Sequence, residues 1–579
     1  MKNSILQQLK QYKGVFIAAP VLMIASGIME TLIPLMTAHI VDDGIEQGNI
    51  SEVLRWGGFM LIFAVSALVF SLLGYVFSAK ASSGLAANLR EAVFARIQGF
   101  SFSELDRFGV PSLVLRQTTD VTNIQTAVQT ILTQFFKTPV AIVYSLVLTM
   151  QLNVQLSVVL IIGVAAIGIF LSAIILRSIK MYRRVYADYD DMNLMVQENV
   201  TGIRVVKSFA REKQESERYD ASANTVRKGF VKVERLLAFN NPVMMLALEF
   251  CFIGIAWIGA RFISVGSMTS GDLTGFIAYA FQIMSYMAMI VLSFVQLSSS
   301  FASIRRVREV LETESSIRDP ARPAEEMKDG SISFSKVSFR YREGDGGNVL
   351  DDIDLSIRAG EMVGVVGATG SSKTSLVSLI PRLYDVRSGA VKVGGKDVRE
   401  YDADTLSGGI SMVLQKNVLF SGTILENLRW GKPNATMEEC EEACRMACAD
   451  AFISEKEKKY EEVLEQGGSN LSGGQRQRLC LARALIKKPK ILILDDALSA
   501  LDTATEGKIR NTLRTEMPEM TKVIITQRVG SVRDADRILV LDKGRVAGFD
   551  THEKLMESCS LYRELVAAAE NEEEEEESA

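Results

Sequence analysis

The sequence predicts two fold classes in one chain, an α-helical membrane domain of six spans followed by an α/β domain. Hydrophobic residues make up 48% of the 579 residues, and the long apolar runs lie before Arg305. After Arg305 short apolar runs alternate with polar stretches, which is typical of a soluble α/β domain. The chain exceeds the length of one ordinary domain, which agrees with this division.

The predicted boundaries follow these changes in composition. Pro320 and Pro323 stand in a charged stretch that suits a linker. Six consecutive glutamates lie near the end of the chain, and we expect them to form a solvated, disordered tail. Without them the net charge of −5 nearly vanishes, which gives no support to nucleic-acid binding. The predicted segments are a membrane domain at 1–310, a linker at 311–330, an α/β domain at 331–568 and an acidic tail at 569–579.

The membrane domain is predicted from apolar stretches that reach the ~20 residues needed to cross a bilayer. Basic residues gather before the first span and after the second and fourth, whereas acidic residues occupy the loop after the first. The positive-inside rule therefore predicts that both ends of this domain face the cytosol. The six predicted spans are 14–41, 56–78, 127–150, 156–176, 242–263 and 273–297.

The connections after the second and fourth spans are long and have few Gly or Pro breaks. Such composition favours continuous helix. We therefore expect spans two to five to extend well beyond the bilayer, with cytosolic tips at 101–108 and 197–207.

Polar groups within the spans are costly, and such groups often mark a pathway for a ligand. Methionines adapt to varied apolar ligands. A cavity for hydrophobic compounds is therefore one interpretation, and helix packing with a few internal hydrogen bonds is the other. The candidate cavity residues are Glu30, Glu249, Gln282, Met284 and Met287, with Glu249 the first choice for a cationic substrate.

A phosphate-binding loop follows the apolar stretch at 361–367. Backbone N–H groups of such a loop converge on phosphate oxygens at a helix N-terminus. Lys373 supplies positive charge to the β- and γ-phosphates, and the Thr374 hydroxyl is placed to bind Mg²⁺. Glycine usually precedes this lysine, whereas Ser372 stands here and crowds the phosphates unless a negative φ accommodates it. The loop comprises Gly367, Ala368, Thr369, Gly370, Ser371, Ser372, Lys373, Thr374 and Ser375.

Two further motifs follow in a fixed order. Residues 471–475 read LSGGQ and open a basic helical stretch, and the apolar run 491–494 ends in Asp495 and Asp496. The loop, the LSGGQ motif and this carboxylate pair together resemble the nucleotide-binding domain of an ABC transporter. With the six spans, nearly the whole chain is similar to a half-exporter of the type IV ABC fold, whose P-loop NTPase domain carries a helical subdomain.

This resemblance implies roles for individual residues around ATP and Mg²⁺. Tyr341 takes the position that stacks on adenine, Gln415 the one that reaches Mg²⁺ or the attacking water, and Asp495 the one that holds Mg²⁺. The segments 101–108 and 197–207 resemble coupling helices. In the family two such domains pack head to tail, so a partner's ATP would be covered by Leu471, Ser472, Gly473, Gly474, Gln475 and Asp502 of this chain.

Two further positions depart from the family pattern. Asp496 replaces the glutamate that acts as general base, so its carboxylate lies one methylene, about 1.5 Å, further back. Gln527 replaces the histidine of the switch position. These departures and Ser372 belong to this chain's own site, whereas the LSGGQ motif is intact.

This one-sided pattern resembles a subunit of a bacterial heterodimeric multidrug exporter with a degenerate ATP site. The resemblance implies an ATPase translocase of the cytoplasmic membrane that exports hydrophobic or amphipathic compounds. Its second subunit would carry most of the hydrolysis, and membrane lipids would surround both. A lipid flippase, a homodimeric slow ATPase and a regulator that binds ATP without transport remain alternatives.

The cysteines at 440, 444 and 448 share a helical spacing. A metal site would need further ligands, and the two histidines lie far away in sequence. Small apolar residues on one helix face are the favoured interpretation.

Overall fold

The computed structural model describes residues 8–341 and 347–578. The chain divides into two compact units. The first consists of Met1–Gln98 and Val110–Thr313, and the second of Gly99–Gly109 and Glu314–Ala579. The tip segment around residues 101–108 thus groups with the C-terminal unit although it interrupts the membrane sequence.

The regular secondary structure of the first unit is helical wherever the structure describes it. Six stretches within the described ranges are long and apolar enough to cross a membrane, which confirms the predicted number of spans. Only Asn153 separates the third span from the fourth, as the short predicted loop requires. Its helical segments are α1 (Lys13–His39), η2 (Ile40–Ile45), α2 (Ile50–Gln98), α4 (Val110–Leu115), η3 (Arg116–Asp120), α5 (Val121–Thr130), η4 (Ile131–Phe135), α6 (Lys137–Leu152), α7 (Val154–Thr201), α8 (Ile203–Ser208), α9 (Glu212–Ala238), α10 (Asn240–Ser264) and α11 (Ser270–Glu312).

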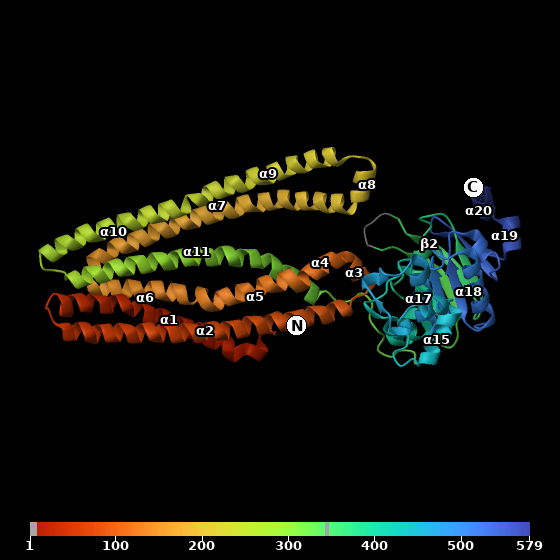
Figure 1. Cartoon of the computed structure of the whole chain (residues 1–579), viewed down its shortest axis with the longest axis horizontal. Helices are drawn as coiled ribbons and strands as arrows, with labels where there is room; N and C mark the ends of the chain where they lie inside the picture. The colour runs from red at the N-terminus through yellow and green to blue at the C-terminus, as the bar shows by residue number, and fades with distance from the viewer. Residues whose placement is uncertain (1–7, 342–346, 579) are drawn as a thin grey trace. The chain divides into compact units, whose positions relative to one another are not determined.

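The expected helical extensions are present. Helix α2 has 49 residues and α7 has 48, so each exceeds the ~20 residues of a membrane span. Figure 1 shows α9 and α10 running beside α7, while α1 lies along α2 and α6. Helix α8 at the tip of this second extension covers residues 203–207 of the segment predicted at 197–207, and residues 197–201 belong to the end of α7.

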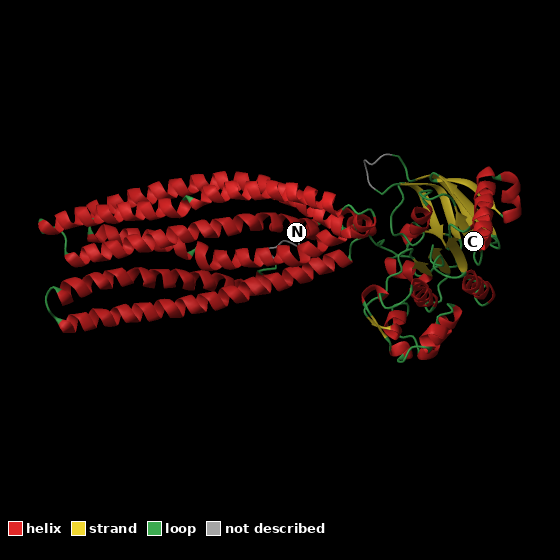
Figure 2. Ribbon diagram, turned by 45° about the horizontal axis from the view of Figure 1, so that its top comes forward, coloured by secondary structure: helices red, strands yellow, loops and turns green. Residues whose placement is uncertain are grey.

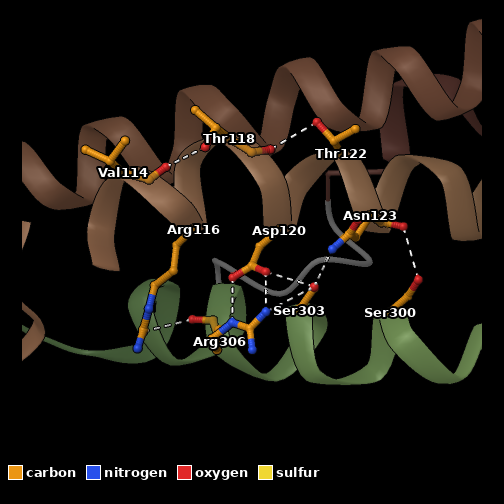
Figure 3. Close-up of polar contacts among 9 residues, drawn as sticks. All are labelled: Val114, Arg116, Thr118, Asp120, Thr122, Asn123, Ser300, Ser303 and Arg306. Carbon is orange, nitrogen blue, oxygen red and sulfur yellow. Dashed lines mark hydrogen bonds and ion pairs between the residues drawn. The ribbon is translucent and has the colours of Figure 1, made fainter. Parts of the chain in front are cut away.

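A polar seam joins the extension of the third span to α11 (Figure 3). Asp120 is fully buried at the end of the π-helical turn η3, and its carboxylate accepts hydrogen bonds from Arg306 Nε at 2.7 Å and Ser303 Oγ at 2.8 Å. Arg116 donates to Glu309 Oε2 at 3.0 Å. Asn123 donates to Ser303 Oγ at 3.1 Å. The two helices are therefore joined by two ion pairs, each with one buried and one partly exposed side chain.

The second unit is an α/β domain with two main sheets (Figure 2). The larger has strand order β12-β11-β3-β10-β9-β6 and is parallel except at β12, and the smaller is antiparallel with order β2-β1-β4-β5. Fully apolar strands suit a parallel sheet covered on both faces. Its strands are β1 (Ile332–Phe339), β2 (Leu350–Ile357), β3 (Met362–Val366), β4 (Ser388–Val393), β5 (Lys396–Asp397), β6 (Ile410–Val413), β7 (Gly422–Thr423), β8 (Val463–Leu464), β9 (Ile491–Asp495), β10 (Thr521–Ile525), β11 (Arg537–Asp542) and β12 (Arg545–Asp550).

The helices of this unit include a group between β6 and β9 that matches the expected helical subdomain. Cys440 and Cys444 are fully buried on one of these helices, and no metal-binding cluster occurs among the residues that the structure describes. The principal helices are α3 (Phe102–Phe108), α12 (Lys373–Ser378), α13 (Ala403–Gly409), α14 (Ile424–Arg429), α15 (Met437–Met446), α16 (Asp450–Ser454), α17 (Gly473–Leu485), α18 (Thr503–Thr515), α19 (His552–Ser558) and α20 (Ser560–Ser578).

The expectation that the acidic tail is disordered is wrong, because its backbone is helical. Helix α20 runs to Ser578 and so includes the glutamate run. Glutamate is a good helix former, and the helix is already started by apolar residues such as Tyr562, which is fully buried. The run therefore continues an existing helix.

Candidate nucleotide-binding site

The phosphate loop lies at the carboxyl end of β3, between the parallel neighbours β10 and β11. All five residues of β3 are buried, so the strand fixes where the loop begins. Helix α12 starts at Lys373 and directs its free N–H groups toward the loop. The sequence therefore folds into a cradle for an anion at this edge of the sheet.

Gly367 and Gly370 have backbone conformations that side chains rarely adopt, with φ of +150° and +84°. A Cβ added at Gly367 would lie 2.3 Å from the carbonyl oxygen of Leu541 and 2.7 Å from Ser371 Oγ. The loop therefore needs glycine at Gly367 for space, and its residues fit a bound phosphate chain.

The backbone of Ser372 has a conformation that a serine does not adopt easily. Its φ is +73° and its ψ is 25°, in the left-handed region that favours glycine. The negative φ that would have accommodated the side chain is therefore not found. The loop keeps the backbone shape of the usual glycine and carries a Cβ and a hydroxyl in addition.

The Lys373 ammonium is held within its own loop. Its Nζ donates to the carbonyl oxygens of Gly367 at 2.6 Å and Ala368 at 3.0 Å. Burial lowers the pKa of Lys373, and the carboxylates of Asp495 and Asp496 oppose that effect. A bound phosphate would offer this ammonium a charged partner in place of the two carbonyls.

Thr374 and Asp495 offer oxygen ligands that suit Mg²⁺. The Thr374 hydroxyl donates to Asp495 Oδ1 at 3.1 Å, and Asp495 is 2% exposed. Its Oδ2 is buried and has no hydrogen-bond partner among the described residues. Burial, and then the neighbouring Asp496, raise the pKa of Asp495. A buried carboxylate oxygen without a partner beside a threonine hydroxyl fits a hydrated divalent cation.

Asp496 and Gln415 meet across the ends of two neighbouring strands, β9 and β6. Burial raises the pKa of Asp496, while a hydrogen bond from the Gln415 side chain and the charge of Lys373 oppose the rise. Asp496 also has a left-handed backbone, with φ of +52°. The structure thus brings together the two residues predicted to handle the attacking water.

The adenine position and the switch position both lie at the surface of this unit. The Tyr341 ring is 42% exposed, and its hydroxyl is 2.7 Å from Ser375 Oγ in the phosphate loop. Gln527 is exposed just after β10. Both side chains are therefore available to a nucleotide.

The LSGGQ motif forms a complete helix N-cap. Ser472 Oγ accepts from the N–H of Gln475 at 3.2 Å, and the Gln475 side chain accepts from the N–H of Ser472 at 3.1 Å. This capping box leaves Ser472 and Gly473 exposed at the start of α17. Asp502 likewise caps α18, accepting from the N–H of Thr505 at 2.9 Å.

Sequence reasoning missed two residues that support this site. Gln477 is 6% exposed, and its Oε1 accepts from the N–H of Ala500 at 3.0 Å, which ties the signature helix to the segment before Asp502. The Tyr384 hydroxyl donates to Asp106 at 2.6 Å, and the Tyr384 ring packs against Tyr341 with centroids 5.1 Å apart. The tip segment 101–108 therefore contacts Tyr384, which packs on the tyrosine predicted to stack on adenine.

The candidate cavity residues of the membrane domain fall into three places. Glu30 and Gln282 are neighbours, since Gln282 Nε2 donates to the Glu30 carbonyl oxygen at 3.2 Å. Met284 is 3% exposed and packs with Met287 in a cluster that includes Ile167. Glu249 is exposed on α10.

Two families match the chain. The ABC transporter transmembrane region matches residues 16–287, and the ABC transporter family matches residues 350–499. The solved structure of a bacterial Atm1-family ABC exporter with ATP bound is similar with a TM-score of 0.80 and 26% identity. That likeness covers 97% of this chain and 99% of the exporter.

Several relatives align along most of the chain. An uncharacterised ABC transporter ATP-binding protein of Bacillus subtilis is 35% identical over 96% of each chain. A similar protein of Mycobacterium tuberculosis is 34% identical over 97% of each chain. An ATP-dependent lipid A-core flippase of Desulfotalea psychrophila is 33% identical over 81% of this chain and 82% of its own. With both domains matched, the chain belongs to the ABC transporter family and is an exporter half-transporter that joins a six-helix membrane domain to an ATP-hydrolysing domain.

Proposed function

We propose that the chain is one subunit of a heterodimeric exporter that moves hydrophobic or amphipathic compounds out across the cytoplasmic membrane. The observation that supports this most is the contrast between its two nucleotide-facing surfaces. Its own phosphate-loop site departs from the family pattern at Ser372, Asp496 and Gln527. Its signature at 471–475 keeps the family sequence and forms a complete capping box.

Hydrolysis at this chain's own site is expected to be slow. The phosphate loop and Lys373 hold the phosphates, and Mg²⁺ supplies positive charge there when bound through Thr374, Asp495 and Gln415. The Asp496 carboxylate accepts the proton of the attacking water from one methylene further back than a glutamate. A misplacement of about 1 Å lowers a rate by ~10²-fold. Gln527 can donate a hydrogen bond to a γ-phosphate but cannot carry charge.

The signature of this chain serves the partner's ATP. In a head-to-tail pair, Ser472 and Gly474 donate hydrogen bonds across the interface, and the N-terminus of α17 adds its favourable dipole. Hydrolysis therefore takes place mainly between the partner's phosphate loop and residues 471–475 of this chain. A homodimer of this chain would instead hold two impaired sites, which is the slow-ATPase alternative.

The membrane domain supports export of apolar compounds with both termini in the cytosol, since the basic residues gather on that side of the spans. Lipid flipping is a second candidate, because the relative from Desulfotalea psychrophila is named as an ATP-dependent lipid A-core flippase. The two candidates differ in what stimulates the purified transporter. Lipophilic drugs would stimulate hydrolysis in the first, and lipids alone would do so in the second.

The subunit composition tests the heterodimer directly. The tagged full-length chain is purified from the cells that naturally produce it, and the intact assembly is weighed by native mass spectrometry. We expect one copy of this chain with one copy of a second ABC half-transporter. An assembly of two copies of this chain would contradict the proposal and favour a homodimer.

A further inference from the structure

A charged cluster lies between α1, α6 and α11, and ATP handling makes no use of it. The Glu30 carboxylate on α1 accepts from Lys137 Nζ at 2.7 Å, from the Tyr286 hydroxyl at 3.0 Å and from Ser26 Oγ at 3.2 Å. Lys137 and Tyr286 lie far from Glu30 in sequence, whereas Ser26 precedes it by one turn of α1. The carboxylate is therefore fully paired, with Lys137 as its counterion.

This pair lies at membrane depth. Glu30 belongs to the span Lys10–Ile45 and Lys137 to the span Val110–Leu152. About 22 Å of helix separates each residue from the far end of its span, whereas a hydrocarbon core is about 30 Å thick. Charged groups within spans are costly, so they are rarely kept without a function.

The packing of α1 is shaped to receive the lysine. A Cβ at Gly27 would lie 3.1 Å from Lys137 Cγ, so the glycine leaves room for the lysine stem to cross α1. The Lys137 side chain is 15% exposed, whereas the Glu30 side chain is 32% exposed. The cation is thus largely enclosed, and the carboxylate stays accessible from one side.

A spare acceptor completes the cluster. Gln282 Nε2 donates to the Glu30 carbonyl oxygen, while Gln282 Oε1 is buried and has no hydrogen-bond partner among the described residues. An accessible carboxylate next to an unsatisfied amide oxygen would suit a cation. The enclosed Lys137 ammonium already pairs with the carboxylate, whereas Gln282 Oε1 stays without a partner among the described residues.

We propose that Lys137 is a tethered counterion that sets the charge selectivity of the substrate site around Glu30. The inference rests on the proposed export of amphipathic compounds, and it names the charge class of the compounds that this site binds. Because the pair is neutral, the native site favours neutral or zwitterionic amphiphiles over lipophilic monocations. A cationic substrate can pair with the Glu30 carboxylate only if it displaces the Lys137 ammonium. Lys137 is then left without a counterion at membrane depth.

The test compares two probes of the same shape and opposite charge, tetraphenylphosphonium and tetraphenylborate. Their binding to the full-length chain in lipid nanodiscs is measured by equilibrium dialysis, with empty nanodiscs as background. The ratio of the two dissociation constants in the native chain is the reference. We expect Lys137→Met to tighten phosphonium binding at least tenfold and Glu30→Gln to tighten borate binding at least tenfold.

Two control variants keep the test decisive where a single change destabilises the chain. Lys137→Arg keeps the charge and should keep the native ratio. The double variant Glu30→Gln/Lys137→Met removes both charges and should also show the native ratio. Single variants that keep the native ratio would overturn the proposal, and so would a double variant that gains a preference for either ion. The assay needs neither ATP nor the partner, so its failure is distinguishable from failure of the heterodimer.

Discussion

Ser372 shows how one residue can alter a loop whose shape is otherwise preserved. Its left-handed φ of +73° is the conformation that glycine adopts without cost, and the added Cβ stands where the backbone must approach a phosphate. Ser372→Gly should therefore tighten ATP binding about fivefold, equivalent to about 1 kcal/mol. A nucleotide titration of the purified chain measures this.

The matched control separates the backbone from the hydroxyl. Ser372→Ala removes only the hydroxyl and keeps the Cβ, so it should bind ATP as the native chain does. If both variants bind ATP equally more tightly than the native chain, the hydroxyl and not the Cβ weakens ATP binding.

Asp495 is poorly paired without its ligand, so its replacement should stabilise the nucleotide-free chain. Asp495→Asn removes a charge whose Oδ2 has no partner among the described residues, a gain of about 1 kcal/mol in the free energy of unfolding at neutral pH. Burial raises the pKa of Asp495 in the folded state, so the folded state holds this proton more tightly than the unfolded state. The native carboxyl thus destabilises the fold increasingly as the pH rises through that raised pKa.

The gain from Asp495→Asn should therefore shrink as the pH is lowered through that range. Thermal unfolding of both proteins at several pH values, without nucleotide, measures the difference. A gain that grows on acidification would contradict the sign of this shift.

At the scale of residues, the sequence predicts the identities at the site and little of their geometry. Motif spacing places Asp495 at the end of β9 and Lys373 and Thr374 at the start of α12, and the sheet brings these two places together. The sign of φ at Ser372 is not predictable, because a serine stands here at the motif position that usually holds glycine. The contact between Tyr384 and Asp106 joins residues distant in sequence and has no local signal.

At the scale of elements, the polar seam that joins η3 and α5 to α11 should govern the stability of the membrane domain. Arg306 pairs with the fully buried Asp120, whereas Arg308 on the same helix pairs with the exposed Glu312 (Figure 3 shows the first pair). Arg306→Met leaves a buried carboxylate without its counterion and should cost about 3–5 kcal/mol. Arg308→Met breaks an exposed pair and should cost less than about 1 kcal/mol.

Thermal unfolding of both variants in nanodiscs compares the two arginines directly. Equal, small losses would show that the buried pair contributes no more than a surface pair. The extension of α7 beyond the bilayer was predictable from its apolar run and from the few Gly or Pro breaks that follow it. The seam was not, because Asp120 looks like any other acid of a cytosolic connection until the register of α11 buries it.

At the scale of the whole molecule, the proposed function gives the chain one impaired site and one intact half-site. Six spans and the order of the nucleotide motifs were enough to predict the fold class, since each is a long or specific signal. Sequence alone does not show that Glu30 and Lys137 pair, because their meeting depends on how the helices pack.

The measurement that tests the central claim most directly is ATP hydrolysis by this chain alone in lipid nanodiscs. The native chain is compared with the double variant Asp496→Glu/Gln527→His, which restores the usual base and switch residues. We predict near-zero hydrolysis by the native chain and a gain of about 10²-fold in the double variant. Brisk hydrolysis by the native chain, unchanged by the two substitutions, would contradict the degenerate site and indicate a working homodimer.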